Sequence, residues 1–301
     1  MEGFKNNFAT KGKLLAQESL AKYTSWKVGG KAKYMFFPTD STTLREAIEY
    51  LYLHEIPWKI LGKGSNILIS DKYFDGVVII LTKLVSIERQ SQHRFIIEAG
   101  VSLPRLCRQL AKIGITGHEF LSGIPGTIGG AVVMNAGTPA GEMKDILISA
   151  RVLDTETGII RIFSNTELEF SYRHSILKQQ NKYVILSVDC FFAEEQEAGA
   201  SMQIIKINKK KRENAQPLNF PSCGSVFRNP ENAFAGKLIE QVGLKGYSIG
   251  AALVSPKHAN FIVNTGDATA TEIRALIELI QTKVEAETNI YLPTEVEFFN
   301  F

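Results

Sequence analysis

The chain has 301 residues, of which 45% are hydrophobic and 22% charged, so it can bury a substantial core and is not a disordered protein. Its length exceeds the usual size of a single core and favours two or three subdomains. A formal net charge of +3 is too small to indicate nucleic-acid binding by itself.

The three cysteines lie far apart and form no Cys-x-x-Cys pair, so neither a disulfide framework nor a metal site is expected. The first ten residues contain no signal-peptide pattern. The most apolar run, Val77–Leu81, is far shorter than the roughly 20 residues that a membrane-spanning helix needs. We therefore expect a cytoplasmic protein without membrane insertion.

The first part of the chain alternates between strand and helix patterns. Thr43 and Glu46 stand in capping-box spacing and predict the start of a helix. The loop Gly62–Asn66 is too rich in glycine to be a generic connection. The strands expected around these features are Lys33–Phe37, Trp58–Leu61 and Ile67–Ile69.

The middle of the chain predicts more strands and one clear helix. This helix has Ser102 as its expected N-cap and Gly114 as its stop signal. A long glycine-rich stretch separates two groups of strands. The expected strands are Val77–Leu81, Phe95–Glu98, Leu147–Leu153, Ile159–Phe163 and Tyr183–Phe192.

The last part begins at a charged joint near Glu194–Gly199 and continues into a basic helix that ends around Arg212. A second helix, from Thr269 to about Glu287, is predicted by Thr269 and Glu272 in capping-box spacing and by a regular apolar stripe. The pattern of Glu295–Phe299 predicts a short final strand. The basic run Lys206–Arg212 is expected to be a solvated helix face.

The glycine-rich stretch Gly123–Ala131 contains four glycines in nine residues, and Asn135–Gly137 follows soon after. Backbone without side chains can approach a diphosphate closely and offer it N–H donors. The spacing matches neither the Rossmann fingerprint nor the Walker A pattern. Tight turns between strands are the alternative interpretation, and for one loop alone the two interpretations are equally plausible.

Together, Gly62–Asn66, Gly123–Gly130 and Asn135–Gly137 resemble the FAD-binding fold of vanillyl-alcohol-oxidase-type (PCMH) flavoproteins. Within that superfamily the chain is identified as a member of the UDP-N-acetylenolpyruvoylglucosamine reductases, over about Thr24 to Phe299, in the form without an inserted tyrosine loop. The resemblance implies an α+β protein with two FAD-binding subdomains, 1–75 and 76–200, and an α+β substrate-binding domain, 201–291. A terminal strand at about 292–301 would be able to return to the first subdomain.

The resemblance also implies non-covalent FAD, because no histidine or cysteine lies in a motif for covalent flavin attachment. The residues that it assigns to the cofactor all lie in the glycine-rich loops. They are Gly62, Lys63, Gly64, Ser65, Asn66, Ile124, Pro125, Gly126, Thr127, Gly129, Gly130, Ala131, Asn135, Ala136 and Gly137.

The implied activity is the NADPH-dependent reduction of UDP-N-acetylglucosamine enolpyruvate to UDP-N-acetylmuramate, in the synthesis of peptidoglycan precursors. The flavin N5 would pass a hydride to C2, and C3 would receive a proton. This chemistry needs an acid, an anion stabiliser and a group that orients them. The family motifs offer Ser225, Arg173 and Glu295 for these functions.

Each of these residue types suits its implied function. A serine hydroxyl is a very weak acid and must be held beside the reacting carbon. A guanidinium binds a carboxylate through two parallel hydrogen bonds and keeps its charge. A serine that bonds within its own turn, a surface arginine and an ordinary strand carboxylate are the alternatives for Ser225, Arg173 and Glu295, respectively.

Substrate contacts are expected from Tyr172, Arg228 and Asn229, next to the catalytic motifs, and Lys257, His258 or Asn260 could line the cleft. The expected partners are the UDP-sugar enolpyruvate and NADPH, with no nucleic acid, and the protein is expected to be a monomer. Two other functions stay open from the sequence: an FAD-dependent alcohol or sugar oxidase of the same fold, and a non-catalytic flavin or nucleotide sensor.

Overall fold

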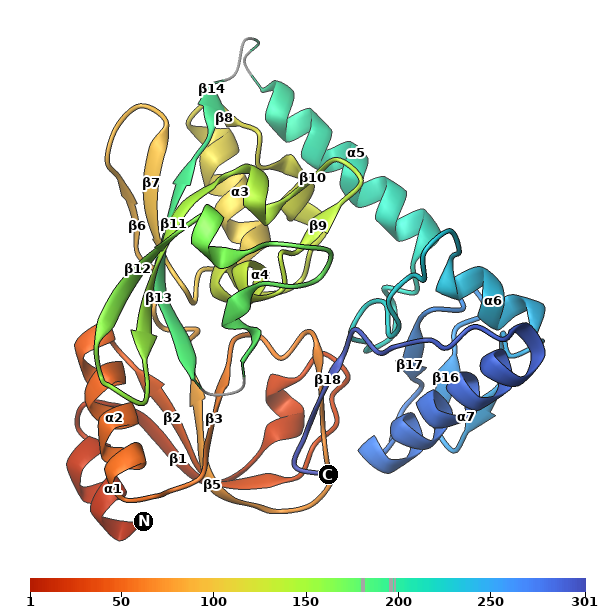
Figure 1. Ribbon diagram of the computed structural model, residues 1–301, viewed down its shortest axis with the longest axis horizontal. Helices are drawn as coiled ribbons and strands as arrows, with labels where there is room; N and C mark the ends of the chain where they lie inside the picture. Colours follow the sequence, from red (N-terminus) through yellow and green to blue (C-terminus); the bar gives the residue numbers. More distant parts are fainter. Residues whose placement is uncertain (180–181, 195–196, 198) are drawn as a thin grey trace. The chain divides into compact units, whose positions relative to one another are not determined.

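The chain forms two compact units, each built from segments that are distant in the sequence (Figure 1). The computed structural model describes residues 1–179, 182–194, 197 and 199–301. Unit 1 consists of Met1–Ala16, Tyr34–Lys63 and Asp75–Lys210, and unit 2 of Gln17–Lys33, Gly64–Phe74 and Lys211–Phe301. The two units cut across the three subdomains proposed from the sequence, which stay a prediction.

Unit 1 contains a five-stranded sheet in which all neighbouring strands are antiparallel, in the order β12-β11-β13-β7-β6. Four of its strands match the predicted segments to within a residue at each end. The strands are β6 (Ile87–Arg89), β7 (Arg94–Glu98), β11 (Leu147–Asp154), β12 (Ile160–Ser164) and β13 (Tyr183–Phe191). Two helices of the same unit are α3 (Leu103–Lys112) and α4 (Ile128–Val133).

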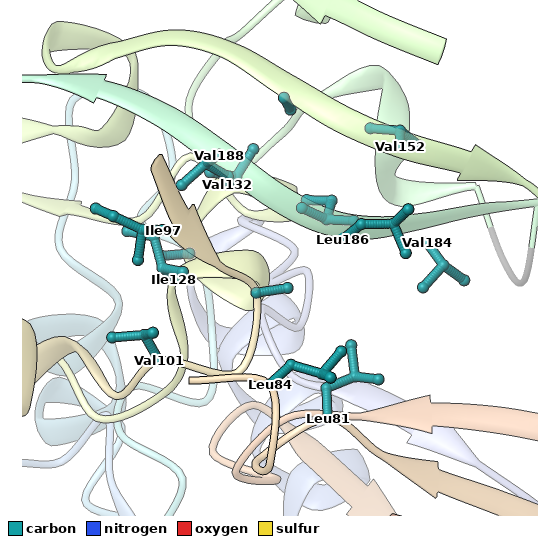
Figure 2. Close-up of a cluster of buried hydrophobic side chains, with 14 of the residues drawn as sticks. Leu81, Leu84, Ile97, Val101, Ile128, Val132, Val152, Val184, Leu186 and Val188 are labelled. Atoms are coloured by element: carbon teal, nitrogen blue, oxygen red, sulfur yellow. The ribbon is translucent and has the colours of Figure 1, made fainter. Parts of the chain in front are cut away.

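Figure 2 shows how α4 is held on this sheet. Ile128 and Val132 of α4 lie together with Ile97 of β7 and Val188 of β13. All four side chains are buried. Burying each such side chain contributes roughly 1.5–3 kcal/mol, so the apolar face of α4 fixes the glycine-rich stretch to the sheet.

A four-stranded sheet has the order β1-β2-β5-β3, with β3 and β5 parallel. Its strands are β1 (Gly12–Ser19), β2 (Lys31–Pro38), β3 (Trp58–Leu61) and β5 (Phe74–Ile80). Helices α1 (Glu2–Phe8) and α2 (Ser41–Leu53) contribute to the same core of unit 1. Phe4 stacks on Phe8 with ring centroids 4.7 Å apart, and these two buried rings attach the otherwise largely exposed first helix to the core.

The predicted start of α2 at Thr43 is wrong. Asp40 is the N-cap, and its carboxylate accepts hydrogen bonds from the Thr43 amide at 2.7 Å and the Thr43 hydroxyl at 3.1 Å. The backbone hydrogen bond lowers the pKa of Asp40. A capping carboxylate three residues upstream therefore satisfies the helix terminus, and Thr43 becomes part of the first turn.

Unit 2 is built around α7 (Ala270–Thr288), which packs on β16 of an antiparallel sheet with the order β15-β16-β17. The predicted capping box of Thr269 and Glu272 is confirmed. The predicted apolar stripe of α7 is entirely buried. The other elements are α6 (Ala235–Gln241), β15 (Ser248–Ile249), β16 (Ala252–Val254) and β17 (Ile262–Asn264).

The last strand, β18 (Glu297–Phe299), pairs in parallel with β4 (Ile67–Ile69) within unit 2. The prediction that this strand starts at Glu295 is wrong. The amide of Glu295 donates to the carbonyl of Val226 at 2.8 Å, and the ladder with β4 begins only at Glu297. Glu295 therefore lies in the bend before the strand.

The basic helix α5 (Ala200–Ala215) extends three residues beyond its predicted end. Residues 195, 196 and 198 of the predicted joint lie outside the described residues. None of the helices that the structure describes combines the length and apolar character needed to cross a bilayer. The remaining short elements are η1 (Leu20–Tyr23), β8 (Ile115–Thr116), η2 (Glu119–Gly123), β9 (Gly137–Thr138), β10 (Gly141–Glu142), η3 (Met143–Asp145), η4 (Thr166–Leu168), η5 (Ile176–Lys178) and β14 (Ala193–Glu194).

Candidate active site

The two predicted phosphate loops meet within unit 1. A Cβ on Gly62 would lie 2.6 Å from the hydroxyl oxygen of Thr127, so a larger residue would force the Thr127 side chain to shift. The ammonium of Lys63 donates to the Ser102 hydroxyl at 2.7 Å, and Ser102 forms a β-bridge with Thr127. The sequence predicted both loops, and the fold brings them together.

Thr127 caps α4, a helix that the sequence analysis missed. Its hydroxyl accepts from the amide of Gly130, while the amides of Ile128 and Gly129 donate to carbonyls of residues 101 and 99. These two amides are therefore already paired and are not the phosphate donors that the glycine content suggested. Ile128, Ala131 and Val132 follow Thr127 at helical spacing, which is the signal that could have revealed the helix.

Gly129 and Gly130 differ in why they are glycine. A Cβ on Gly129 would lie 2.9 Å from the Cβ of Ala99, so close packing explains this residue. Gly130 is exposed, and the nearest atom to a Cβ there would be 3.6 Å away. Glycine inside a helix costs roughly 0.5–1 kcal/mol relative to alanine. Close approach of a ligand would explain why this residue is glycine, and the diphosphate of a cofactor such as FAD fits that explanation.

The surroundings of Lys63 also suit an anion. Partial desolvation and the charge of Arg108 lower the pKa of the Lys63 ammonium. Two cationic side chains near each other repel, and a bound phosphate would relieve that repulsion. The residues next to the Gly62 loop in unit 1 therefore fit the phosphates of FAD.

The Asn135–Gly137 motif holds the turn that carries Arg173. The side chain of Asn135 is fully buried and donates to Glu142 at 3.0 Å and to the Ser171 carbonyl at 3.2 Å. Its oxygen accepts from the amide of Lys144 at 3.1 Å. The guanidinium of Arg173 donates to the carbonyl of Gly137 at 3.2 Å. The motif has a structural function here, so a cofactor contact by Asn135 rests on the resemblance alone.

Arg173 adopts an uncommon backbone conformation. Ser171 and His174 exchange two backbone hydrogen bonds of 3.1 Å and enclose a two-residue turn, in which Arg173 has a φ of 56°. A left-handed conformation costs a side-chain-bearing residue roughly 1–2 kcal/mol. The guanidinium lies over the ring of Tyr172, 5.1 Å from its centroid. The fold thus holds this arginine in one strained turn.

Ser225 and Glu295 are neighbours in unit 2. The residue after Ser225, Val226, accepts the amide of Glu295 at 2.8 Å, and Phe227 forms a β-bridge with Thr294. Gly224, just before the serine, has a φ of 77° with open space around a Cβ, so backbone conformation alone requires glycine there. The fold brings together two motifs that lie 70 residues apart in the sequence.

The second half of the Gly62–Asn66 loop supports this pair within unit 2. The side-chain amide of Asn66 donates to the Glu295 carbonyl at 3.1 Å. The thiol of Cys223 contacts the carbonyls of Gly64 and Ile67 at 3.7 and 3.6 Å. Burial raises the pKa of Cys223 to about 12, so the thiol stays neutral and its function is packing.

Comparison with known proteins shows to which protein family a chain with this arrangement belongs. Residues 32–164 match the FAD binding domain family, and residues 216–299 match the UDP-N-acetylenolpyruvoylglucosamine reductase C-terminal domain. The reductase of Bacillus pumilus is 38% identical over 99% of this chain and 98% of its own length. That of Caldanaerobacter subterraneus is 42% identical over 95% of this chain and 93% of its own.

The chain belongs to the UDP-N-acetylenolpyruvoylglucosamine reductase family. The crystal structure of the Thermus caldophilus reductase covers 96% of this chain and 99% of its own, with a TM-score of 0.80 and 32% sequence identity. The predicted α+β fold with an FAD-binding part is confirmed.

The three residues expected to contact the substrate of a reductase of this family lie in different units and differ in exposure. Tyr172 is 48% exposed, next to Arg173 in unit 1. In unit 2, the Nε atom of Arg228 is buried and has no hydrogen-bond partner among the described residues, so it could donate to a ligand. Asn229 is exposed, and its oxygen accepts from the amide of Ala235 at the start of α6.

The other candidates suggested for the reductase cleft make contacts within unit 2. Lys257 donates to the carbonyl of Glu213, and the ring of His258 is half-buried against Phe261. Asn260 is buried and bonds to the backbone of Phe227. Of the remaining cofactor candidates, Pro125 is exposed, Ser65, Ile124 and Ala136 are half-buried, and Gly126 and Ala131 are buried. Within the described residues no cluster of side chains could hold a metal ion.

Proposed function

We propose that this chain reduces UDP-N-acetylglucosamine enolpyruvate to UDP-N-acetylmuramate, with FAD as bound cofactor and NADPH as reductant, in peptidoglycan precursor synthesis. Similarity over nearly the whole length of family members supports the reaction. The hydrogen bond from the Glu295 amide to Val226, which links the Glu295 and Ser225 motifs, is the observation that supports the catalytic assignment. Cytoplasmic location and a monomeric state stay predictions.

A bound FAD would supply the hydride chemistry between NADPH and C2 of the enolpyruvyl group. In unit 1, Gly62, Lys63 and Gly130 would hold the cofactor phosphates, since Gly130 leaves room and Lys63 carries charge. For Gly130 the assignment follows from its exposure and from a nearest neighbour 3.6 Å from a Cβ, so packing of the protein does not require glycine there.

The chain's own residues would supply the proton and the charge stabilisation. The hydroxyl of Ser225 would deliver a proton to C3 from a loop whose direction is fixed on both sides of the serine. The guanidinium of Arg173 would bind the substrate carboxylate and stabilise the negative charge that develops on it. Glu295, joined to the serine segment through Val226, would orient the Ser225 hydroxyl or a group that returns a proton to it.

The test separates the two half-reactions under anaerobic conditions. In Ser225→Ala, NADPH should bleach the visible flavin absorbance at the parental rate. Reoxidation by the enolpyruvyl substrate should slow by a factor on the order of 10²–10⁴, the usual contribution of a general acid. Stopped-flow absorbance at the flavin band measures both rates.

Ser222→Ala is the matched control, since Ser222 lies in the same loop three residues upstream. It should leave both rates unchanged. Parental reoxidation in Ser225→Ala would show that the acid is assigned incorrectly. A flavin that stays oxidised with NADPH would contradict the proposed reductant itself.

A further inference from the structure

We infer that Asn260 is a positioning residue that sets the direction of Ser225. Asn260 is only 4% exposed, and its side-chain oxygen accepts from the amide of Phe227 at 2.9 Å. Its side-chain nitrogen donates to the carbonyl of the same Phe227, also at 2.9 Å. Its backbone carbonyl accepts from the amide of Val226 at 2.9 Å. One residue thus satisfies three backbone groups directly after the serine.

The Asn260 side chain pairs with the backbone of Phe227 as a neighbouring strand would. A side-chain amide presents one donor and one acceptor at a fixed spacing, as a neighbouring strand does. On the other edge of the same segment, Val226 and Phe227 pair with residues 294 and 295, and the amide of Arg228 donates to the carbonyl of Pro293 at 2.9 Å. The serine segment is therefore bonded on both edges, and Asn260 supplies one of them.

Asn260 is itself held in place. Its amide donates to the Nδ1 atom of His258 at 3.3 Å, and Phe261 and Ser255 close the surrounding turn with a backbone hydrogen bond of 2.8 Å. A fixed side chain can transmit its position to a neighbour, whereas a mobile one cannot. The turn thus provides the rigidity that a positioning residue needs.

The inference rests on the proposed function, in which Ser225 donates the proton. A weak acid such as serine must lie within hydrogen-bond reach of the carbon that it protonates. A displacement of about 1 Å costs on the order of 10²-fold in rate. Loss of Asn260 should therefore act on substrate-driven reoxidation and not on the reduction of the flavin by NADPH.

Asn264 offers a matched control in the same unit. It is 3% exposed, and its oxygen accepts from the amides of Gly266 and Ala268, while its nitrogen donates to the carbonyl of Trp26. Its removal should cost a comparable number of buried hydrogen bonds. None of these side-chain bonds reaches the serine segment, and the substitution keeps the backbone amide of Asn264, which donates to the carbonyl of Pro221 at 2.9 Å. Any general loss of stability is therefore shared by both variants.

The experiment compares Asn260→Ala, Asn264→Ala and Ser225→Ala as FAD-bound proteins, at a temperature where each retains the parental flavin spectrum. Asn260→Asp is included because it keeps the size of the side chain and the acceptor for the Phe227 amide, but sets an oxygen in place of the donor to the Phe227 carbonyl, so it breaks one bond without opening a cavity. We expect both Asn260 variants to slow reoxidation at saturating substrate, Asn260→Ala by on the order of 10–100-fold, with parental flavin reduction. Asn264→Ala should leave both rates unchanged.

The pH profile of each half-reaction is measured as well. General destabilisation would change both profiles, whereas a displaced Ser225 should change the profile of reoxidation only. Equal reoxidation rates in Asn260→Ala and Asn264→Ala would overturn the positioning function, as would parental reoxidation in Asn260→Asp. Slow reoxidation in Ser225→Ala together with parental reoxidation in both Asn260 variants would overturn this inference alone. Parental reoxidation in Ser225→Ala would overturn the proposed function instead.

Discussion

Backbone conformation restricts each of the two proposed catalytic turns at one residue. Arg173 has a φ of 56°, and Gly224, next to Ser225, has a φ of 77°. The conformation of Arg173 is strained and persists because surrounding bonds over-determine it, as is common at functional sites, whereas Gly224 adopts a positive φ without a side-chain penalty. Asn135 holds the carbonyl of Ser171 in the first turn, and Asn260 holds Phe227 after the second. In both cases a buried asparagine fixes the backbone next to the functional side chain.

Gly130 allows a test of the cofactor site that needs no turnover. Gly130→Ala should stabilise the flavin-free protein slightly, by up to about 1 kcal/mol, because alanine favours the helix and the nearest atom, 3.6 Å from the new Cβ, is at an ordinary contact distance. The same change should weaken FAD binding, because the added methyl group would occupy the space of the ligand. Thermal denaturation of the flavin-free protein and titration with FAD measure the two effects.

Gly129→Ala is the contrasting variant. Its Cβ would overlap Ala99, so it should destabilise the flavin-free protein by about 1–3 kcal/mol. If Gly130→Ala bound FAD as tightly as the parent, the proposed cradle would be wrong at this residue.

At the scale of whole elements, the start of α7 depends on a partner that is distant in the sequence. The first two amides of α7, those of Ala270 and Thr271, donate to the carboxylate of Asp71 at 2.9 and 3.0 Å. The Thr271 hydroxyl also donates to it, at 3.0 Å. This cap adds to the capping box, so α7 has both a local and a remote N-terminal partner.

Asp71→Ala should therefore destabilise unit 2 by about 1–2 kcal/mol, since two amides at the helix start lose their acceptor. The measurement is urea unfolding in a Trp58→Phe background, in which the buried Trp26 reports on unit 2 alone. Asp267→Ala removes an exposed carboxylate two residues before the N-cap and controls for the charge. A similar loss in both variants would show that charge, and not hydrogen bonding, is responsible.

On the scale of the whole molecule, the chain passes repeatedly between two units that have separate buried cores. Arg173 belongs to unit 1, whereas Ser225 and Glu295 belong to unit 2. The Gly62–Asn66 loop is itself divided, because Lys63 ends one segment of unit 1 and Gly64 opens one of unit 2. Each unit can therefore be studied through residues that it alone contains.

The stability of unit 2 should depend on pH through His258. Burial and, to a lesser extent, the charge of Lys245 lower the pKa of this histidine, and its Nδ1 atom accepts from Asn260. The folded state thus binds the proton less readily than the unfolded state. Stability from this group is complete above its usual pKa of about 6.5 and is lost as the pH falls towards the lowered folded value.

Unfolding of the same Trp58→Phe protein between about pH 7.5 and pH 5.5 should show this decrease. His258→Gln should flatten the dependence, whereas His54→Gln, which changes an exposed histidine of unit 1, should not. An unchanged slope in His258→Gln would assign the pH dependence to other groups.

The sequence by itself determined the elements whose signals are local. The stripe of α7 and its capping box lie within one helix, and the strands of the five-stranded sheet have strong apolar patterns, so both could be predicted. The α+β fold, the family and the glycine-rich loops followed from long ordered motifs. Local patterns depend on neighbouring residues, which the sequence contains directly.

Other features depend on contacts between segments that are distant in the sequence, and only the tertiary structure decided these. A bond from the Glu295 amide to Val226 keeps Glu295 out of the last strand, and the apolar face of α4 is buried against β7 and β13. The functions of Asn135 and Asn260 likewise depend on backbone groups over 30 residues away. Such hydrogen bonds form only after the chain has folded, so spacing in the sequence does not reveal them.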